Sequence, residues 1–246
     1  MLSERRQLEM KILSIIHDGR EPVGSGTISE QLRQAGIKVS EATVGRVLRG
    51  LDAQGYTERV GYQGRIITAR GLEQLAELRR EKEKLSYGFE LIKLVHSTSK
   101  ENLIDLLVAR RAIEGETAYL AALNATEKEI LQLHEILERQ RSHYRFGIGG
   151  AEEDLKFHGL IAEMGRNKVL QAALKLIRQD GQLGPVLEYI RKEVHSSIVV
   201  DHERIAQAIA DRKAEEARAA MVTHIENLMA DVEKYWDQVI KKNKTG

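Results

Sequence analysis

The chain has 246 residues, of which 42% are apolar and 30% charged, a composition that suits one large domain or two smaller ones with buried cores. Its 38 basic residues nearly balance 37 acidic ones, so net charge favours no class of partner. Cysteine is absent, which excludes disulfides, thiolate metal sites and cysteine nucleophiles. No stretch reaches the roughly 18 apolar residues of a membrane span, and no signal-peptide pattern follows Met1. We therefore expect a cytoplasmic protein with no membrane partner.

The first 70 residues change from helical to β periodicity. Apolar residues at spacings of three and four predict three short helices, the third of them capped by Ser40. A run of β-branched and aromatic residues on both sides of Gln63-Gly64 then predicts a hairpin. The expected elements are helices over 5–18, 27–35 and 40–55 and a hairpin over 56–68. This order predicts a winged helix-turn-helix, which binds double-stranded DNA.

Basic residues are concentrated where a winged helix contacts DNA. Residues 1–85 carry 15 basic and 12 acidic side chains. The apolar stripe of the third helix turns its other face outward, where arginines contact phosphates or guanine edges. The predicted DNA-binding residues are Thr43, Arg46, Arg49, Arg59 and Arg65, the last of which follows the hairpin tip. The alternative is a winged helix that binds protein and leaves these arginines hydrated.

The rest of the chain has helical periodicity throughout. Residues 71–88 predict a charged connecting helix that ends at Ser86-Tyr87-Gly88, and residues 89–246 predict an all-α effector domain. Its expected helices cover 101–123, 127–145, 151–164, 168–181, 184–197, 199–210 and 214–241, with a break at 146–150. The fold class is therefore mainly α, with an N-terminal winged helix-turn-helix over 1–70 and a C-terminal antiparallel helical bundle.

Four side chains in this second part have the spacing of a metal site. Asp154 and His158 are four residues apart, so on a helix they project from one face. His202 lies 10 residues before Arg212 and His224 lies 12 after it, which places both imidazoles at similar height in a helical hairpin. Together they can form a three-His, one-carboxylate site for Zn²⁺, Ni²⁺, Mn²⁺ or Fe²⁺. Spacing alone also fits ordinary surface or helix-end histidines.

One segment and these spacings carry a resemblance to a known family. The run Leu-Val-Ala-Arg-Arg-Ala-Ile-Glu-Gly-Glu-Thr-Ala-Tyr-Leu-Ala-Ala (107–122) resembles the first core helix of the FCD effector domain of FadR-type GntR transcription regulators. Downstream, four positions are similar to that family's metal ligands in order and approximate spacing. They are Asp154, His158, His202 and His224. The similarity covers roughly residues 90–240.

The resemblance implies a fold, a site and an effector. The four residues would bind the metal in an antiparallel helical bundle, beside a ligand cavity. Many members of the family sense small carboxylates, so Arg110 is expected to contact such an organic acid. Arg110 can equally form a buried pair with Glu114, one helical turn away. Asn167 and His195 are weaker candidates for the cavity wall.

The N-terminal part departs from the FadR-type pattern. That family's Leu-Pro-Ser-Glu-Arg segment and Val-Arg-x-Ala-Leu recognition helix are both absent. Residues 23–32 (Val-Gly-Ser-Gly-Thr-Ile-Ser-Glu-Gln-Leu) and 59–72 instead resemble the winged helices of archaeal nitrogen-repressor proteins. The resemblance to GntR regulators therefore applies to the effector half.

The sequence predicts a homodimeric transcription regulator rather than an enzyme. In this hypothesis a metal and a small organic acid modulate operator binding, and two copies bind two half-sites about one helical turn apart. The alternatives are a metalloenzyme and a metal-stabilised interaction module. An open three-His, one-carboxylate site can activate water. However, no additional general base is evident from the spacing of the residues, and a DNA-binding domain has no role in catalysis. Spacing does not distinguish a structural metal from a sensed one.

Overall fold

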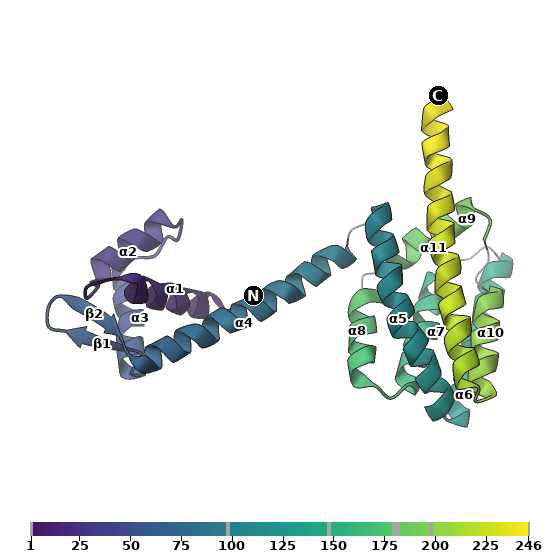
Figure 1. The fold of residues 1–246 in the computed structure, drawn as a ribbon, viewed down its shortest axis with the longest axis horizontal. Coiled ribbons are helices and arrows are strands. Elements are labelled where there is room, and N and C mark those ends of the chain that lie inside the picture. Colours follow the sequence, from purple (N-terminus) through teal and green to yellow (C-terminus); the bar gives the residue numbers. More distant parts are fainter. Residues whose placement is uncertain (1, 97–98, 147–148, 179–182, 197–198, 246) are drawn as a thin grey trace. The chain divides into compact units, whose positions relative to one another are not determined.

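Three short helices and a hairpin form the first of two units, residues 1–90 of the computed structural model (Figure 1). The structure describes residues 2–96, 99–146, 149–178, 183–196 and 199–245. The first unit contains α1 (Glu4–Asp18), α2 (Ser25–Gln34), α3 (Glu41–Ala53), β1 (Thr57–Val60) and β2 (Gly64–Ile67). This order confirms the predicted winged helix.

The core of this unit is built from the predicted apolar stripes. On α3, Val44, Leu48 and Leu51 follow helical spacing and are fully buried. The Ser40 hydroxyl accepts a hydrogen bond from the Thr43 amide at 3.1 Å, which satisfies a free amide at the start of the helix. Because the stripe fixes the inward face of α3, its opposite face lies in water.

The wing is a short antiparallel hairpin closed by Gly61, Tyr62 and Gln63. Its tip is therefore centred on Tyr62, before the predicted Gln63-Gly64. Gly64 has φ 141°, and a Cβ there would lie 2.4 Å from the carbonyl carbon of Val23. Only glycine allows this approach, which lets Val23 form a β-bridge with Arg65 and attach the wing to the segment before α2.

Helix α4 (Ala69–Val95) begins in the first unit and its last residues, 91–95, belong to the second. Leu75 and Leu78 pack into the winged-helix core, and Arg6 of α1 forms an ion pair with Glu81 at 2.7 Å. The predicted end at residues 86–88 is not a break. A glycine inside a helix costs about 1 kcal/mol relative to alanine, which is too little to end a long helix at Gly88.

The second unit, residues 91–246, is an all-α bundle (Figure 1). Its remaining helices are α5 (Lys100–Asn124), α6 (Glu127–Phe146), α7 (Ala151–Met164), α8 (Lys168–Arg178), α9 (Leu183–Glu193), α10 (Val199–Ala210) and α11 (Ala214–Thr245). The antiparallel bundle and the mainly α fold class are confirmed. The predicted helix ends at 181 and 197, and residues 147–148 of the predicted break, lie outside the described residues.

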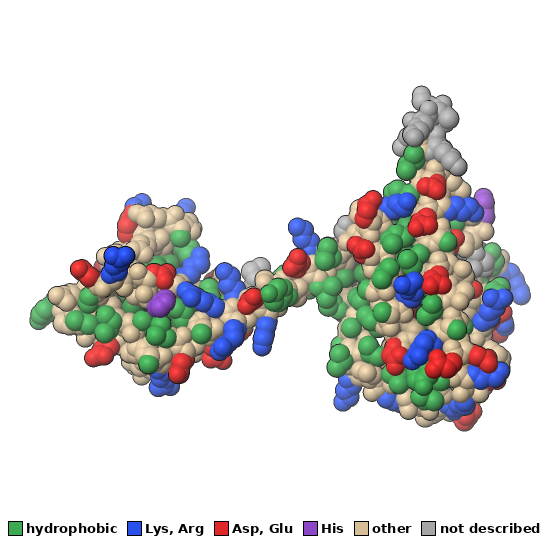
Figure 2. Space-filling view, viewed as in Figure 1, with side chains coloured by type: hydrophobic (Ala, Val, Ile, Leu, Met, Phe, Trp, Pro, Cys, Tyr) green, Lys and Arg blue, Asp and Glu red, His purple; other side chains and the backbone are tan. Residues whose placement is uncertain are grey.

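Helices α5 and α11 pack side by side along the bundle. A Cβ on Gly115 of α5 would lie 3.2 Å from Val222 Cγ2 of α11, so a small residue permits this close packing. Ion pairs cross the same seam, including Arg218 with Glu116 at 2.7 Å. Figure 2 shows acidic and basic side chains interspersed on the face that carries these two helices. Among the helices that the structure describes, none is long and apolar enough to cross a membrane.

Candidate metal centre and nucleic-acid interface

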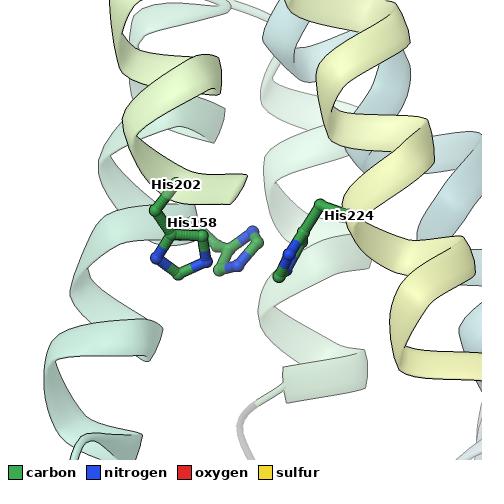
Figure 3. A group of neighbouring side chains, drawn as sticks. All are labelled: His158, His202 and His224. Atoms are coloured by element: carbon green, nitrogen blue, oxygen red, sulfur yellow. The ribbon is translucent and has the colours of Figure 1, made fainter. Parts of the chain in front are cut away.

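Three helices bring one histidine each to a common point inside the second unit (Figure 3). His158 lies on α7, His202 on α10 and His224 on α11, and one nitrogen of each ring lies within 4.8 Å of the others. All three residues are at most 1% exposed. The α10–α11 hairpin turns at Arg212, which has φ 61°, and the rings of His202 and His224 lie 4.7 Å apart between centroids.

Asp154 completes the set of four predicted ligands. It lies one turn before His158 on α7, and its Oδ1 is 3.7 Å from His158 Nε2 and 3.6 Å from His202 Nε2. Its other oxygen, Oδ2, accepts a hydrogen bond from Arg178 Nη2 at 2.5 Å. The carboxylate therefore presents one oxygen to the histidines while an arginine holds the other.

The atoms that face this centre lack ordinary partners. Within the described part of the chain, Nε2 of each of the three histidines and Oδ1 of Asp154 are buried without a hydrogen bond. Buried polar atoms are almost always satisfied by protein, water or an ion. Three imidazole nitrogens and one carboxylate oxygen are the donor set that first-row divalent metals prefer. The residues present therefore fit such a metal.

Each imidazole is oriented by a partner on its other nitrogen. Such contacts fix which ring nitrogen carries the proton and leave Nε2 free to bind a metal. The contacts are His158 Nδ1 with Glu114 Oε2, His202 Nδ1 with Gln140 Oε1 at 2.8 Å, and His224 Nδ1 with Asp201 Oδ2 at 3.5 Å. Each partner lies on a different helix from the histidine that it contacts, so sequence spacing did not identify it.

The protonation states also suit a metal. Burial lowers the pKa of His202 well below its usual range and the pKa of His224 to about 4, so both rings are neutral at pH 7. Burial alone raises the pKa of the Asp154 carboxyl, but Arg178 and the neighbouring histidines outweigh it and hold that pKa well below its usual range. Neutral imidazoles and an ionised carboxylate are the forms that coordinate metals.

Arg110 forms the buried pair with Glu114 that the sequence allowed. Its Nε donates to Glu114 Oε1 at 2.5 Å, so it forms the buried pair, and the residue is 1% exposed. It also lines a cavity of about 250 Å³ together with Asp154 and Arg178. Its Nη2 has no hydrogen-bond partner among the described residues. That leaves a buried donor beside the metal centre.

The two weaker cavity candidates are placed differently. His195 lines a second cavity, of about 410 Å³, that Asp154 also lines. Asn167 is exposed and lines neither cavity, because its Oδ1 accepts hydrogen bonds from the Val169 and Leu170 amides, both at 3.1 Å, and caps α8. An asparagine before an amphipathic helix is a common N-cap, so the geometry gives its predicted ligand role no support.

Two arginines of the site were not singled out from the sequence. Arg178 binds Asp154, and Arg191 lines the larger cavity. Each lies four residues after a buried leucine, Leu174 on α8 and Leu187 on α9. A basic residue in the register of an apolar stripe is the signal that would have identified both.

The predicted DNA-binding residues fall into two groups. Arg46 and Arg49 are exposed on α3, and Arg59 is exposed on β1, where its Nε donates to the Gly61 carbonyl at 3.0 Å. Thr43 is half-buried, and its hydroxyl lies 2.9 Å from that of Ser40 at the helix start. The two α3 arginines therefore have the greatest freedom to meet a groove.

Arg65 is held in the protein rather than presented to solvent. Its Nε donates to both oxygens of Asp52, at 3.0 and 2.9 Å, and its side chain is only 14% exposed. The pair joins the wing to α3, which argues against the predicted groove contact. At the wing tip the fully exposed side chain is Tyr62, a residue that sequence reasoning did not single out.

Comparison with known families gives two matches. The FCD domain matches residues 105–227, which is half of the chain. The winged-helix domain described from ribonuclease R matches residues 10–75. The first match contains all four predicted metal ligands, and the second contains the predicted DNA-binding residues.

Individual relatives match one part of the chain or the other. The Uxu operon regulator of Haemophilus influenzae is 35% identical over 129 residues, 50% of this chain and 48% of that protein. The global nitrogen regulator NrpR of Methanocaldococcus jannaschii is 42% identical over 78 residues, 32% of this chain and 14% of that protein. The chain thus spans about half the length of the first relative and a small part of the second.

A solved structure covers the whole chain. A transcriptional regulator of the GntR family from Pseudomonas syringae pv. tomato aligns with 99% of this chain and 100% of its own, at 15% identity and a TM-score of 0.50. At this identity the likeness concerns the fold alone.

Proposed function

Because the chain belongs to the FCD-domain family of GntR-type regulators, we propose that it is a DNA-binding transcription regulator and a homodimer. We propose further that its helical unit binds a divalent metal and a small carboxylate. The resemblances to FCD effector domains and to archaeal nitrogen regulators are both confirmed. The family is one of regulators and not of enzymes, as the sequence predicted.

The observation that carries the metal proposal is the set of four unpartnered atoms. Nε2 of His158, His202 and His224 and Oδ1 of Asp154 are buried and directed at one centre. Leaving buried polar atoms unpaired is costly, and a divalent cation would satisfy all four. Glu114, Gln140 and Asp201 would keep the three rings in place around it.

Arg110 supports the carboxylate proposal. A bound divalent metal supplies open coordination positions for a carboxylate oxygen. Arg110 lines one cavity with Asp154, and its free Nη2 would offer a charge-assisted hydrogen bond to the same anion. Glu114 fixes the guanidinium by accepting from Nε, so the donor is preorganised.

The winged helix supports the DNA proposal. Arg46 and Arg49 lie on the exposed face of α3, the helix that enters the major groove in this fold. Arg59 and Tyr62 extend the surface along the wing. Two copies would bind two half-sites, and a ligand changes operator affinity only as far as it binds the two arrangements of the dimer differently.

The test measures binding of the purified chain to DNA from upstream of its own gene, with and without chelator, at two salt concentrations. We expect salt-sensitive binding that survives nonspecific competitor and changes on chelation. Arg46→Ala should weaken it, whereas Arg80→Ala, which removes an exposed arginine of α4, should not. Binding that is nonspecific for every DNA tried, or unaffected by Arg46→Ala, would contradict the proposal.

The metal site needs its own pair of variants. His224→Ala should abolish the response to chelator, because it removes one of the four ligands. His134→Ala is the matched control, since His134 is exposed on α6. An unchanged chelator response in His224→Ala would contradict the proposed metal centre.

A further inference from the structure

A third arginine, Arg191, lies near the buried cluster of Arg110, Glu114, Asp154 and Arg178 but has no carboxylate paired with it in the described part of the chain. Arg110 pairs with Glu114 and Arg178 with Asp154. Among the residues that the structure describes, none forms an ion pair with Arg191 of α9, and its Nε is shielded from solvent without a hydrogen bond. Arg191 lines the same cavity as Asp154, one of the four proposed metal ligands.

The charges around Arg191 act on it in opposite directions. Burial lowers the pKa of its guanidinium, Asp154 and Asp231 oppose that effect, and the like charges of Arg110 and Arg178 reinforce it. An arginine side chain stays protonated in proteins, so Arg191 remains a buried cation whose Nε has no hydrogen-bond partner within the described part of the chain.

Arg191 and Asp154, one of the four proposed metal ligands, line one cavity. The cavity of about 410 Å³ is within the size range of small-molecule sites. Asp154 on α7 and Gln140 on α6, the partner of His202, line one wall, and Arg191, Lys192 and His195 line the wall from α9 and the residues just after it. A single small molecule in this cavity can reach both walls.

The acidic residue on the α9 wall of the cavity does not reverse the net positive charge of that wall. Glu188 lines the same cavity, but its two oxygens accept hydrogen bonds from the Gly150 and Ala151 amides, both at 3.1 Å, and so cap α7. Its carboxylate keeps its charge there, but Arg191 and Lys192 on the same wall outnumber it, so the wall keeps a net positive charge. Asp154 also lines the smaller cavity of about 250 Å³, the one that Arg110 lines, so the two cavities adjoin the same carboxylate.

We propose that the effector is a doubly anionic acid, with one carboxylate at the metal centre and a second anionic group bound by Arg191. This inference rests on the proposed function, because the first carboxylate needs the metal. The second group supplies the negative charge that Arg191 lacks and receives a charge-assisted hydrogen bond from its free Nε. Arg191 thereby selects dicarboxylates over monocarboxylates of the same length.

The test is calorimetric titration of the full chain loaded with Zn²⁺, using butanoate and its dicarboxylate counterpart butanedioate. We expect butanedioate to bind at least about tenfold more tightly, the factor that one charge-assisted hydrogen bond supplies. Arg191→Gln should reduce this preference to within about threefold, while the variant retains its zinc and still binds butanoate. Those two readings show that the variant is folded and its metal centre intact.

Lys128→Gln, which removes one exposed positive charge from α6, is the matched control and should keep the full preference. If wild type binds butanoate but shows no preference for butanedioate, or if Arg191→Gln keeps the preference, the doubly anionic effector is overturned while the metal and carboxylate proposal stands. If neither acid binds the zinc-loaded chain, the carboxylate effector itself fails.

Discussion

The two units of this protein place their charged side chains in opposite environments. In the winged helix, Arg46, Arg49 and Arg59 lie in water. In the helical unit, three histidines, Arg110, Glu114 and Asp154 are almost completely buried. Exposed charges cost little to maintain, so these arginines are free to contact another charged molecule. Buried charges are expensive unless each is compensated, so a buried cluster with unpartnered atoms supports the proposal that an ion or ligand binds there.

The difference also determines how substitutions behave. Residues on the outer face of α3 contact few neighbours, so their effects should be independent and confined to DNA binding. In the helical unit Glu114 contacts Arg110 and His158 at once, and Asp154 contacts Arg178. Changes there should propagate through stability, metal binding and effector binding together.

The largest effect should come from Glu114→Ala. The substitution leaves the buried Arg110 uncompensated and His158 without its orienting partner, and breaking a buried pair in this way costs about 3–5 kcal/mol. Urea unfolding followed by the fluorescence of Trp236, the single tryptophan of the chain, reads the helical unit. Glu116→Ala, on the same helix but in a partly exposed pair with Arg218, should cost less than about 1 kcal/mol. Equal losses of unfolding free energy in the two variants would contradict the difference between the buried and the exposed pair.

Metal removal should rank next. A metal present at a hundred times its dissociation constant stabilises the folded state by about 2.7 kcal/mol. A chelator should therefore lower the melting temperature read from Trp236 in wild type and leave it unchanged in His224→Ala. A chelator that lowers both equally would mean that the metal binds elsewhere.

Two arginines of the winged helix allow the same comparison between an exposed and a largely buried charge. Arg49→Ala should weaken specific DNA binding by about 1–3 kcal/mol without changing stability, because Arg49 is exposed. Arg65→Ala removes a largely buried pair with Asp52 and should cost about 1 kcal/mol of stability. Hydrogen exchange of the β1 and β2 amides should accelerate in Arg65→Ala alone. Faster exchange in Arg49→Ala would mean that its surface role has been misassigned.

The smallest effect should come from Tyr62→Ala at the wing tip. Its side chain is fully exposed, so the fold should be unaffected. An aromatic ring that contacts the minor groove should contribute roughly threefold to tenfold in DNA affinity. Electrophoretic mobility shifts with specific and competitor DNA measure this directly, and an unchanged affinity would confine the DNA surface to α3 and Arg59.

Sequence periodicity predicts most of the fold because helix cores follow local spacing. The stripe of Val44, Leu48 and Leu51 is visible in the sequence and buried in the structure. The convergence of His202 and His224 also follows from counting residues along a short helical hairpin. The end of α4 was misplaced, since Gly88 is a weak signal that a long helix overrides.

What the sequence does not reveal depends on tertiary contacts. Arg65 looks like a free wing arginine until the hairpin folds back and brings it to Asp52, which lies before β1. Asn167 looks like a ligand in a family pattern, but its position before α8 makes it a cap. Arg191 stands out only after packing shows that its neighbours Arg110 and Arg178 have carboxylates and it does not.

The central claim is that the buried polar cluster binds one divalent metal through four named residues. The most direct measurement is the metal content per chain of wild type and His224→Ala after exposure to Zn²⁺, Ni²⁺, Mn²⁺ or Fe²⁺ and removal of free ions. We expect one tightly held ion in wild type and loss of that ion in the variant. Retention of the same amount by His224→Ala, or no retained ion of any kind in wild type, would contradict it.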